Sequence, residues 1–241
     1  MKNSLKPLTL SVAIVLAIGL VLASCGTPTK PKNQSDIGTA FGNAKTATYP
    51  EPVIPFETPM HLQVGQHVRY GVLDKDGQKS ISAYSVIGHN GDVWVLESYS
   101  LTAGNESWTQ LKVAGLDQAM VSRNPDDISI ISARTRNNND APSEIDGVVL
   151  SLTKGIYKDA LAHWTMKTIP EGKDIAMTVP AGTFQGLVKA STTMHIFGSS
   201  LTSTGYYHPA VPISGLVKST SSNGVEMSLL DFGTSGAKAS F

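Results

Sequence analysis

The feature that most limits the fold is a series of short runs separated by turn signals, between residues 64 and 116. The runs are VGQHVRYGVL, QKSISAYSVIG, VWVLESYSL and WTQLKVAGL, and the segments between them are DKDG, HNGD and TAGNES. Asp-Gly, Asn-Gly and Gly-Asn between runs of alternating polarity are strong local signals for β-hairpins. They predict an antiparallel meander of four strands with one face buried. The residues expected to share buried faces are Val68, Tyr70 and Val72; Ile81, Ala83 and Ile87; and Val93, Val95 and Tyr99.

The rest of the chain adds more strands and one helix. We predict strands in DISIISART (127–135) and GVVLSL (147–152), with an exposed polar loop at 136–144. Between 153 and 165, apolar residues at helical spacing predict one amphipathic helix. Strand-like runs then return from DIAMTVP to VEMSLLDFG. The predicted fold class is therefore mainly β, a bent antiparallel sheet or half-open β-barrel, with the helix of about 153–165 packed in or across it.

The chain divides into four parts. We expect a signal peptide at 1–24, a cysteine with a flexible tether at 25–59, a single β-rich domain at 60–234, and a flexible tail at 235–241. The tether is expected because 26–59 is rich in Thr, Pro, Lys, Asn, Gly and Ala and shows no sustained period.

The first 25 residues carry the pattern of an export signal. Lys2 and Lys6 precede a run from 12 to 23 without charge or hydroxyl, and this run is shorter than a membrane-spanning helix needs. It ends in Leu22-Ala23-Ser24-Cys25, which resembles the lipobox of bacterial lipoproteins. The resemblance implies cleavage between Ser24 and Cys25 and acylation of Cys25, whose acyl chains would anchor the protein in a membrane. The alternative is a buried or stray thiol. Gly26, in place of Asp, resembles outer-membrane sorting if the source is Gram-negative; the leaflet stays open.

A second resemblance covers the later strands. VPAGTFQGLVK (179–189), followed by GYYHPAVPISGLVKS (205–219), is similar to a pattern in uncharacterised bacterial periplasmic and outer-membrane proteins, and the first hairpins also look like theirs. The resemblance implies an open antiparallel barrel with a helix, distantly like the lipoprotein carriers of the Lol type. It implies no activity.

Familiar catalytic motifs do not occur in the sequence. It has no Gly-x-Ser-x-Gly elbow, no glycine-rich phosphate motif, and six histidines without metal-site spacing, although His195 and His208 would meet if their strands were neighbours. Nineteen basic and nineteen acidic side chains give no excess that would favour nucleic acid. We therefore expect a protein that is not an enzyme and uses no cofactor, metal or nucleic acid.

Two functions remain open. In the first, a half-barrel shelters a lipid or other apolar ligand in a cavity lined by aromatic residues. In the second, the core is filled and the surface binds an envelope protein, an envelope polymer or a host partner. The candidate cavity residues are Trp94, Trp108, Trp164, Phe184 and Phe197.

The anchor can be tested by removing the thiol. We expect Cys25→Ser to abolish lipidation and the partitioning of the protein into detergent, because its sulfur carries the expected acyl chain. Phase partitioning with mass spectrometry measures both. Unchanged partitioning would overturn the lipoprotein interpretation.

Overall fold

The computed structural model describes residues 37–38, 41–42, 45–54, 56, 61–145, 147–165, 170–196 and 199–241. The lipobox at 22–25 lies outside these residues, as does much of the expected tether. None of the helices in the described ranges combines the length and apolar character needed to cross a bilayer.

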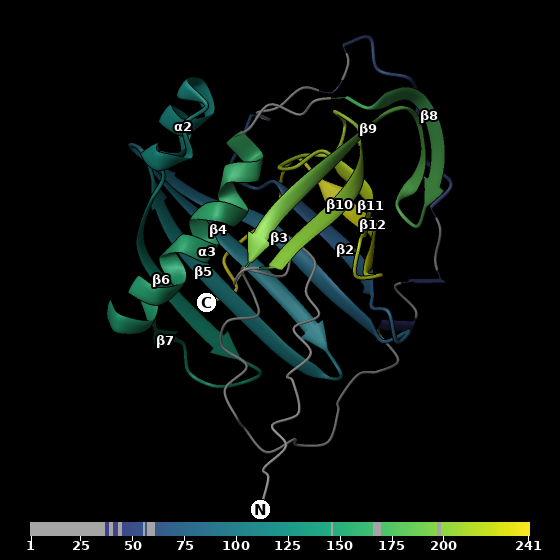
Figure 1. The fold of residues 1–241 in the computed structure, drawn as a ribbon. Helices are drawn as coiled ribbons and strands as arrows, with labels where there is room; N and C mark the ends of the chain where they lie inside the picture. Colours follow the sequence, from purple (N-terminus) through teal and green to yellow (C-terminus); the bar gives the residue numbers. More distant parts are fainter. Residues whose placement is uncertain are drawn as a thin grey trace, which may run out of the picture.

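Within the described residues, twelve strands form one open, mixed sheet (Figure 1). The strand order is β1-β9-β10-β11-β12-β2-β3-β4-β5-β6-β7, and β8 pairs with β9 off this path. The strands are β1 Thr48–Tyr49, β2 His67–Leu73, β3 Lys79–Asn90, β4 Val93–Thr102, β5 Asn105–Ala114, β6 Ser129–Asn137, β7 Ser143–Glu144, β8 Gly172–Val179, β9 Gly182–Ile196, β10 Ser199–Tyr207, β11 Leu216–Ser221 and β12 Glu226–Gly233.

The predicted mainly-β fold class and the four-strand meander are confirmed. β2 to β5 pair in sequence order as antiparallel hairpins. The DKDG turn is stabilised by Asp74, whose carboxylate accepts the N–H groups of Asp76 at 2.9 Å and Gln78 at 2.8 Å. Asp74 therefore acts within the turn, as Asx-turn residues do.

One pair departs from the antiparallel pattern. β1, from the segment expected to be tether, pairs parallel with β9 through Thr48↔Thr183 and Tyr49↔Phe184. The chain at Ala47 comes so close to β9 that a Cβ on Gly182 would lie 2.5 Å from the Ala47 carbonyl oxygen. A glycine, which tolerates both the contact and its φ of +140°, is needed there.

The sheet has two faces with different roles. The inner face carries the main hydrophobic cluster, which also contains residues of the helices that cover it. The outer face carries a small second cluster in which Ile37 packs with Ile81, Leu101 and Leu230. The inner-face residues of β2 to β5 include Tyr70, Tyr84, Val86, Trp94, Leu96, Leu111 and Val113.

The buried faces predicted for β3 and β4 need correction. Val68, Tyr70 and Val72 do face the main core, as predicted. On β3, however, the main core takes Tyr84 and Val86, whereas Ile81 belongs to the second cluster on the outer face. On β4 the main core takes Trp94 and Leu96, whereas the predicted Val93 and Val95 are only half-buried and Tyr99 packs against the second cluster. Both faces of these strands carry apolar residues, so alternation alone does not identify the inner one.

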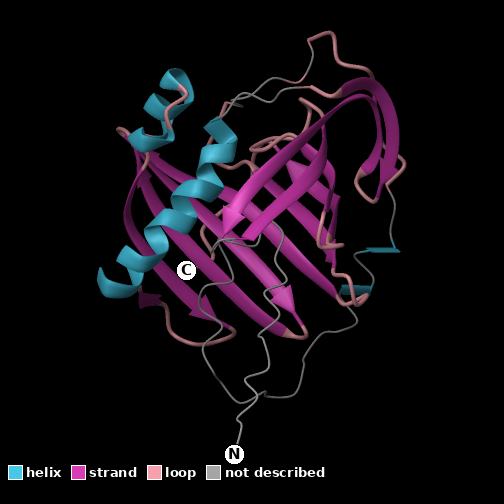
Figure 2. Cartoon of the chain, viewed as in Figure 1, coloured by secondary structure: helices cyan, strands magenta, loops and turns pink. Residues whose placement is uncertain are grey.

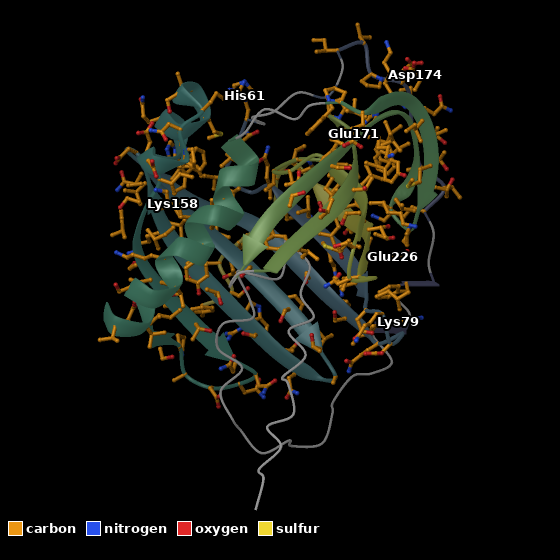
Figure 3. All side chains as sticks on the ribbon, in the orientation of Figure 1. His61, Lys79, Lys158, Glu171, Asp174 and Glu226 are labelled. Carbon is orange, nitrogen blue, oxygen red and sulfur yellow. The ribbon has the colours of Figure 1, made fainter. Side chains whose placement is uncertain are left out.

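Three helical segments are present in the described domain beyond residue 61, and in Figure 2 the longest of them crosses one face of the sheet. They are α2 Leu116–Ser122, the 3₁₀-helix η2 Pro125–Asp127 and α3 Gly147–Thr165. α3 crosses the inner face in front of β4 to β6 (Figure 1). An ion pair of 2.6 Å between Lys158 of α3 and Asp126 ties it to η2, and Lys158 is labelled in Figure 3.

The predicted helix is real but starts earlier than residue 153, and the predicted strand at 147–152 is wrong. This segment forms the first turns of α3. Leu150, Thr153, Tyr157 and Leu161 are all buried, and their spacing places them on one helical face. Tertiary packing of that face therefore outweighs the preference of the β-branched residues at the start of the segment for a strand.

His208 holds the segment around Pro50, which precedes the β-rich domain, against the sheet. Its buried ring contacts the Pro50 carbonyl oxygen through Nε2 at 3.2 Å and accepts the Ala210 N–H through Nδ1 at 3.1 Å. Its ring edge also meets Phe184. Burial lowers the pKa of His208, so the folded protein favours the neutral ring.

We predict a stability loss in mild acid from this site. A histidine has a pKa of about 6.5 in an unfolded chain, so the unfolded state takes up the proton first as the pH falls below that value. The free energy of unfolding should be highest above this pH, fall through the window down to the lowered folded pKa, and then level off. Urea unfolding at several pH values measures it.

The matched variants are His208→Gln, which should flatten the pH dependence, and His61→Gln at an exposed residue, which should leave it in place. An equal pH dependence in the His208→Gln protein would contradict the assignment.

Candidate functional site

The aromatic residues expected to line a cavity do not gather in one place. Trp94 and Phe184 belong to the inner cluster. Trp108 lies on the outer face. It pairs with Tyr99 of β4, and Tyr99 is five residues from the inner-face Trp94, so the two point to opposite faces of the strand. The side chains of Trp164 and Phe197 lie outside the described residues.

Trp94 and Phe184 have packing partners of their own. The Trp94 indole donates to Asp117 of α2 at 3.0 Å and stacks on the His89 ring at 3.8 Å. Phe184 is fully buried and stacks on Tyr49 of β1 with ring centroids 4.4 Å apart. Both rings therefore hold neighbouring elements on the sheet.

The two histidines that neighbouring strands would bring together lie at opposite ends of the β9–β10 hairpin. The register pairs His195 with Ser200, and it pairs Tyr207, the residue before His208, with Val188. In the described parts of the chain, no group of three or more His, Cys, Asp or Glu residues is arranged to hold a metal ion.

An open groove of about 440 Å³ lies on the outer face of the sheet. Its floor comes from β2 to β5 and one wall from the residues after β12. Its lining carries both charge signs and two aromatic rings: His67, Val68, Arg69, Ala83, Ser85, Glu97, Tyr99, Glu106, Trp108, Asp231, Gly236, Ala237, Lys238 and Ser240.

The aromatic part of the groove is formed by Tyr99 and Trp108, whose ring centroids are 5.1 Å apart. The Tyr99 hydroxyl donates to Glu106 at 3.0 Å. The Arg136 guanidinium lies over the Trp108 ring at 4.1 Å, within cation–π range. These contacts fix an amphipathic surface that is half-buried in the structure.

The segment 236–241, which we call the strap, lies on this face, and the end of the chain is marked at β5 and β6 in Figure 1. The sequence predicts a flexible tail here, whereas the structure seats the strap on the sheet. At its start, the Ala237 N–H donates to the Gly65 carbonyl at 2.9 Å. A Cβ on Gly65 would lie 3.0 Å from the Gly236 nitrogen, so the strap passes directly over this glycine.

Glu97 of β4 is the centre of the contacts that hold the strap. It is only 7% exposed. One carboxylate oxygen accepts the Ser240 hydroxyl at 2.7 Å, and the other accepts the Ser240 N–H at 3.0 Å. The second oxygen also accepts the Gln110 side-chain amide at 2.6 Å. A buried carboxylate needs such donors, because burial without partners is costly.

Two arginines of β6 and Gln110 of β5 bind the end of the strap. Arg134 donates to the Gln110 side-chain oxygen at 2.8 Å and to the Phe241 main-chain oxygen at 2.8 Å. Gln110, 3% exposed, donates to the same Phe241 oxygen at 3.0 Å. Arg136 donates to the Ser240 carbonyl at 3.0 Å. The outer face can therefore bind main-chain donors and acceptors together.

Sequence reasoning missed Glu97, Gln110, Arg134 and Arg136. A partial signal was present, since Trp108 and Gln110 alternate along the predicted strand WTQLKVAGL and so share one face. Arg134 lies in the strand predicted at 127–135, whereas Arg136 falls in the loop predicted at 136–144, and the structure extends β6 to Asn137. This pattern indicates a polar face on neighbouring strands. It does not indicate what covers that face.

Comparisons with known proteins give little further guidance. No family model matches the chain, and no curated protein matches it. A solved structure from Bacteroides fragilis, assigned as an exported protein and described as having a YmcC-like fold, aligns with a TM-score of 0.34 and 12% identity. The alignment covers 74% of this chain and all of that one. A likeness of this degree establishes no shared function.

We predict that Glu97→Leu frees the strap. Leucine has similar bulk but no acceptor, so Ser240 and Gln110 lose their charge-assisted partner. If opening becomes easier by about 1.4 kcal/mol, trypsin should cut after the exposed Lys238 about tenfold faster, because cleavage follows the open population. Mass spectrometry of the released end measures the rate.

Glu106→Leu is the matched control. Glu106 lines the same groove and accepts from Tyr99 rather than from the strap. If both variants were cut at the same rate, Glu97 would not be the residue that holds the strap.

Proposed function

We propose that the protein is a membrane-anchored envelope lipoprotein without enzymatic activity, whose β-rich domain binds a partner on its outer face. The anchor would be Cys25, on the evidence of the lipobox residues 22–25 and the apolar run before them. The single observation that supports the binding role is the open groove of about 440 Å³ with its aromatic pair and mixed charges. Sites of this kind combine apolar contact with a few oriented polar groups.

The groove favours a surface-binding role over an apolar carrier. A carrier needs an apolar space on the inner face of the sheet. There, the described side chains of β2 to β12 and of α3 form one continuous hydrophobic cluster, with Phe184, Leu187 and Leu161 fully buried. The groove instead lies on the opposite face, where Glu97 and Glu106 accept hydrogen bonds from Ser240 and Tyr99.

The expected tether would keep this face near the membrane. Ile37 packs on the outer face beside Leu101, and Tyr99 of the groove contacts the same cluster. Eleven residues lie between Cys25 and Ile37, and the twelve residue-to-residue steps span at most about 40 Å when the chain is extended. A domain anchored at Cys25 would therefore hold Ile37, on the same outer face as the groove, within about 40 Å of the bilayer surface.

Photo-crosslinking in intact cells tests the binding role. We expect a photoreactive amino acid at Ser85, in the groove, to form adducts with an envelope component, whereas one at Lys173, exposed on β8, forms none. Electrophoresis of the purified protein measures the adducts. A failure to form any adduct from Ser85, or the same adducts from Lys173, would contradict the proposal.

A further inference from the structure

We propose that the outer-face site around Glu97, Gln110 and the β6 arginines is a polypeptide-binding site, and that the strap occupies it as an internal ligand. The partner is an extended segment of another protein that carries a hydroxyl residue followed by an aromatic residue. This inference rests on the proposed function, since it names the class of partner that binds at the outer face.

The strap is held mainly through its main chain. Gly65 accepts the Ala237 N–H, and Glu97 accepts the Ser240 N–H. The Ser240 carbonyl receives Arg136, and the Phe241 oxygen receives Arg134 and Gln110. Main-chain N–H and carbonyl groups of an extended segment are groups by which proteins recognise peptides. Any polypeptide presents the same groups, so these contacts do not require the strap itself.

Two side chains of the strap add selectivity. The Ser240 hydroxyl donates to Glu97 at 2.7 Å. The Phe241 ring lies 4.9 Å from the Arg134 guanidinium and 5.1 Å from that of Arg136, while Arg136 also lies over Trp108. An aromatic residue at this position thus continues a stack of guanidinium and aromatic groups, which gives cation–π attraction as well as apolar contact.

The strap leaves part of the site unused. The Nε atom of Arg136 is buried and has no hydrogen-bond partner among the described residues. Buried donors without acceptors are rare in folded proteins. A ligand that supplies one more acceptor beside Trp108 would satisfy this atom, so a partner can bind better than the strap does.

The strap is also able to detach from the sheet at a low free-energy cost. Residues 234–236 are exposed, and Gly236 has a φ of +94° with nothing within 4 Å of the place a Cβ would take. Lys238, Ala239 and Ser240 are exposed as well, so the strap buries little apolar surface of its own. Segments with few buried apolar contacts open locally at low free-energy cost.

The polar groups favour a polypeptide over other ligands. Glu97 accepts an N–H and an O–H at the centre of the site, and an ionised phosphate supplies neither donor. Arg134 and Gln110 donate to a carbonyl oxygen, which an acyl chain lacks. A peptide supplies both the N–H for Glu97 and the carbonyl oxygens for the donors.

Because the strap and a partner compete for the same site, the strap lowers the apparent affinity of the protein for an added peptide. A segment joined by a short flexible linker acts at an effective concentration in the mM range. A peptide added at µM concentration therefore binds the unaltered protein poorly. Weakening the strap without touching the site should raise the apparent affinity by about tenfold or more.

The test uses the full-length protein in detergent micelles and a fluorescent copy of residues 234–241, Thr-Ser-Gly-Ala-Lys-Ala-Ser-Phe, with an amidated end. The strap-release variant combines Ser240→Pro, which removes the N–H that Glu97 accepts, with Phe241→Ala. We expect anisotropy titration to show at least about tenfold tighter binding to this variant than to the unaltered protein. Adding Arg134→Leu to the variant should remove that gain.

A peptide whose Phe is replaced by Ala is the matched probe and should bind about tenfold more weakly, since it lacks the ring that meets both arginines. Trypsin cleavage after Lys238 checks that the strap is free. A freed strap without peptide binding would overturn the inference, and so would a strap that stays protected in the release variant. Adducts from Ser85 together with no peptide binding would leave the proposed function standing and refute its peptide partner.

Discussion

The pairing of β12 with β2 is the constraint on which the rest of the structure depends. It joins the late strands β8 to β12 to the early meander, through pairs such as Met227↔Val72 and Gly233↔His67. Without it, neither group would bury a complete inner face. It also sets the path of the strap, because the chain leaves β12 beside His67 and crosses Gly65 at once. The hydrophobic core and the candidate site therefore both depend on the pairing of β12 with β2.

The elements that the sequence predicts well are those encoded locally. The hairpins of β2 to β5 depend on turns such as Asp74–Gly77, whose residues act on their own backbone. Residues 147–152 fit a strand or a helix equally, and the buried face shared with Tyr157 and Leu161 decides for the helix. The inner face of β3 is not predictable from alternation, because Ile81 and Tyr84 are both apolar and lie on opposite faces.

The candidate site depends on contacts between residues far apart in sequence. Glu97 and Gln110 look like ordinary polar strand residues, and the small residues after Gly233 indicate a free tail. Only the register of β12 brings Ser240 to Glu97, and only the β5–β6 pairing adds Arg134 and Arg136. A strap that covers a polar face then explains why a carboxylate and an amide are buried on the outside of the sheet. Under the proposed function, this cover is also the part of the outer face that a partner would replace.

Hydrogen–deuterium exchange tests this account most directly, because it reports the opening free energy of each segment. If the strap is a removable cover on a stable sheet, the Ala237 and Ser240 amides exchange by local opening, many times faster than the Val72 and Met227 amides of the β2–β12 pair. Strap amides that are protected as strongly as the β2–β12 amides, and that exchange only with global unfolding, would contradict it.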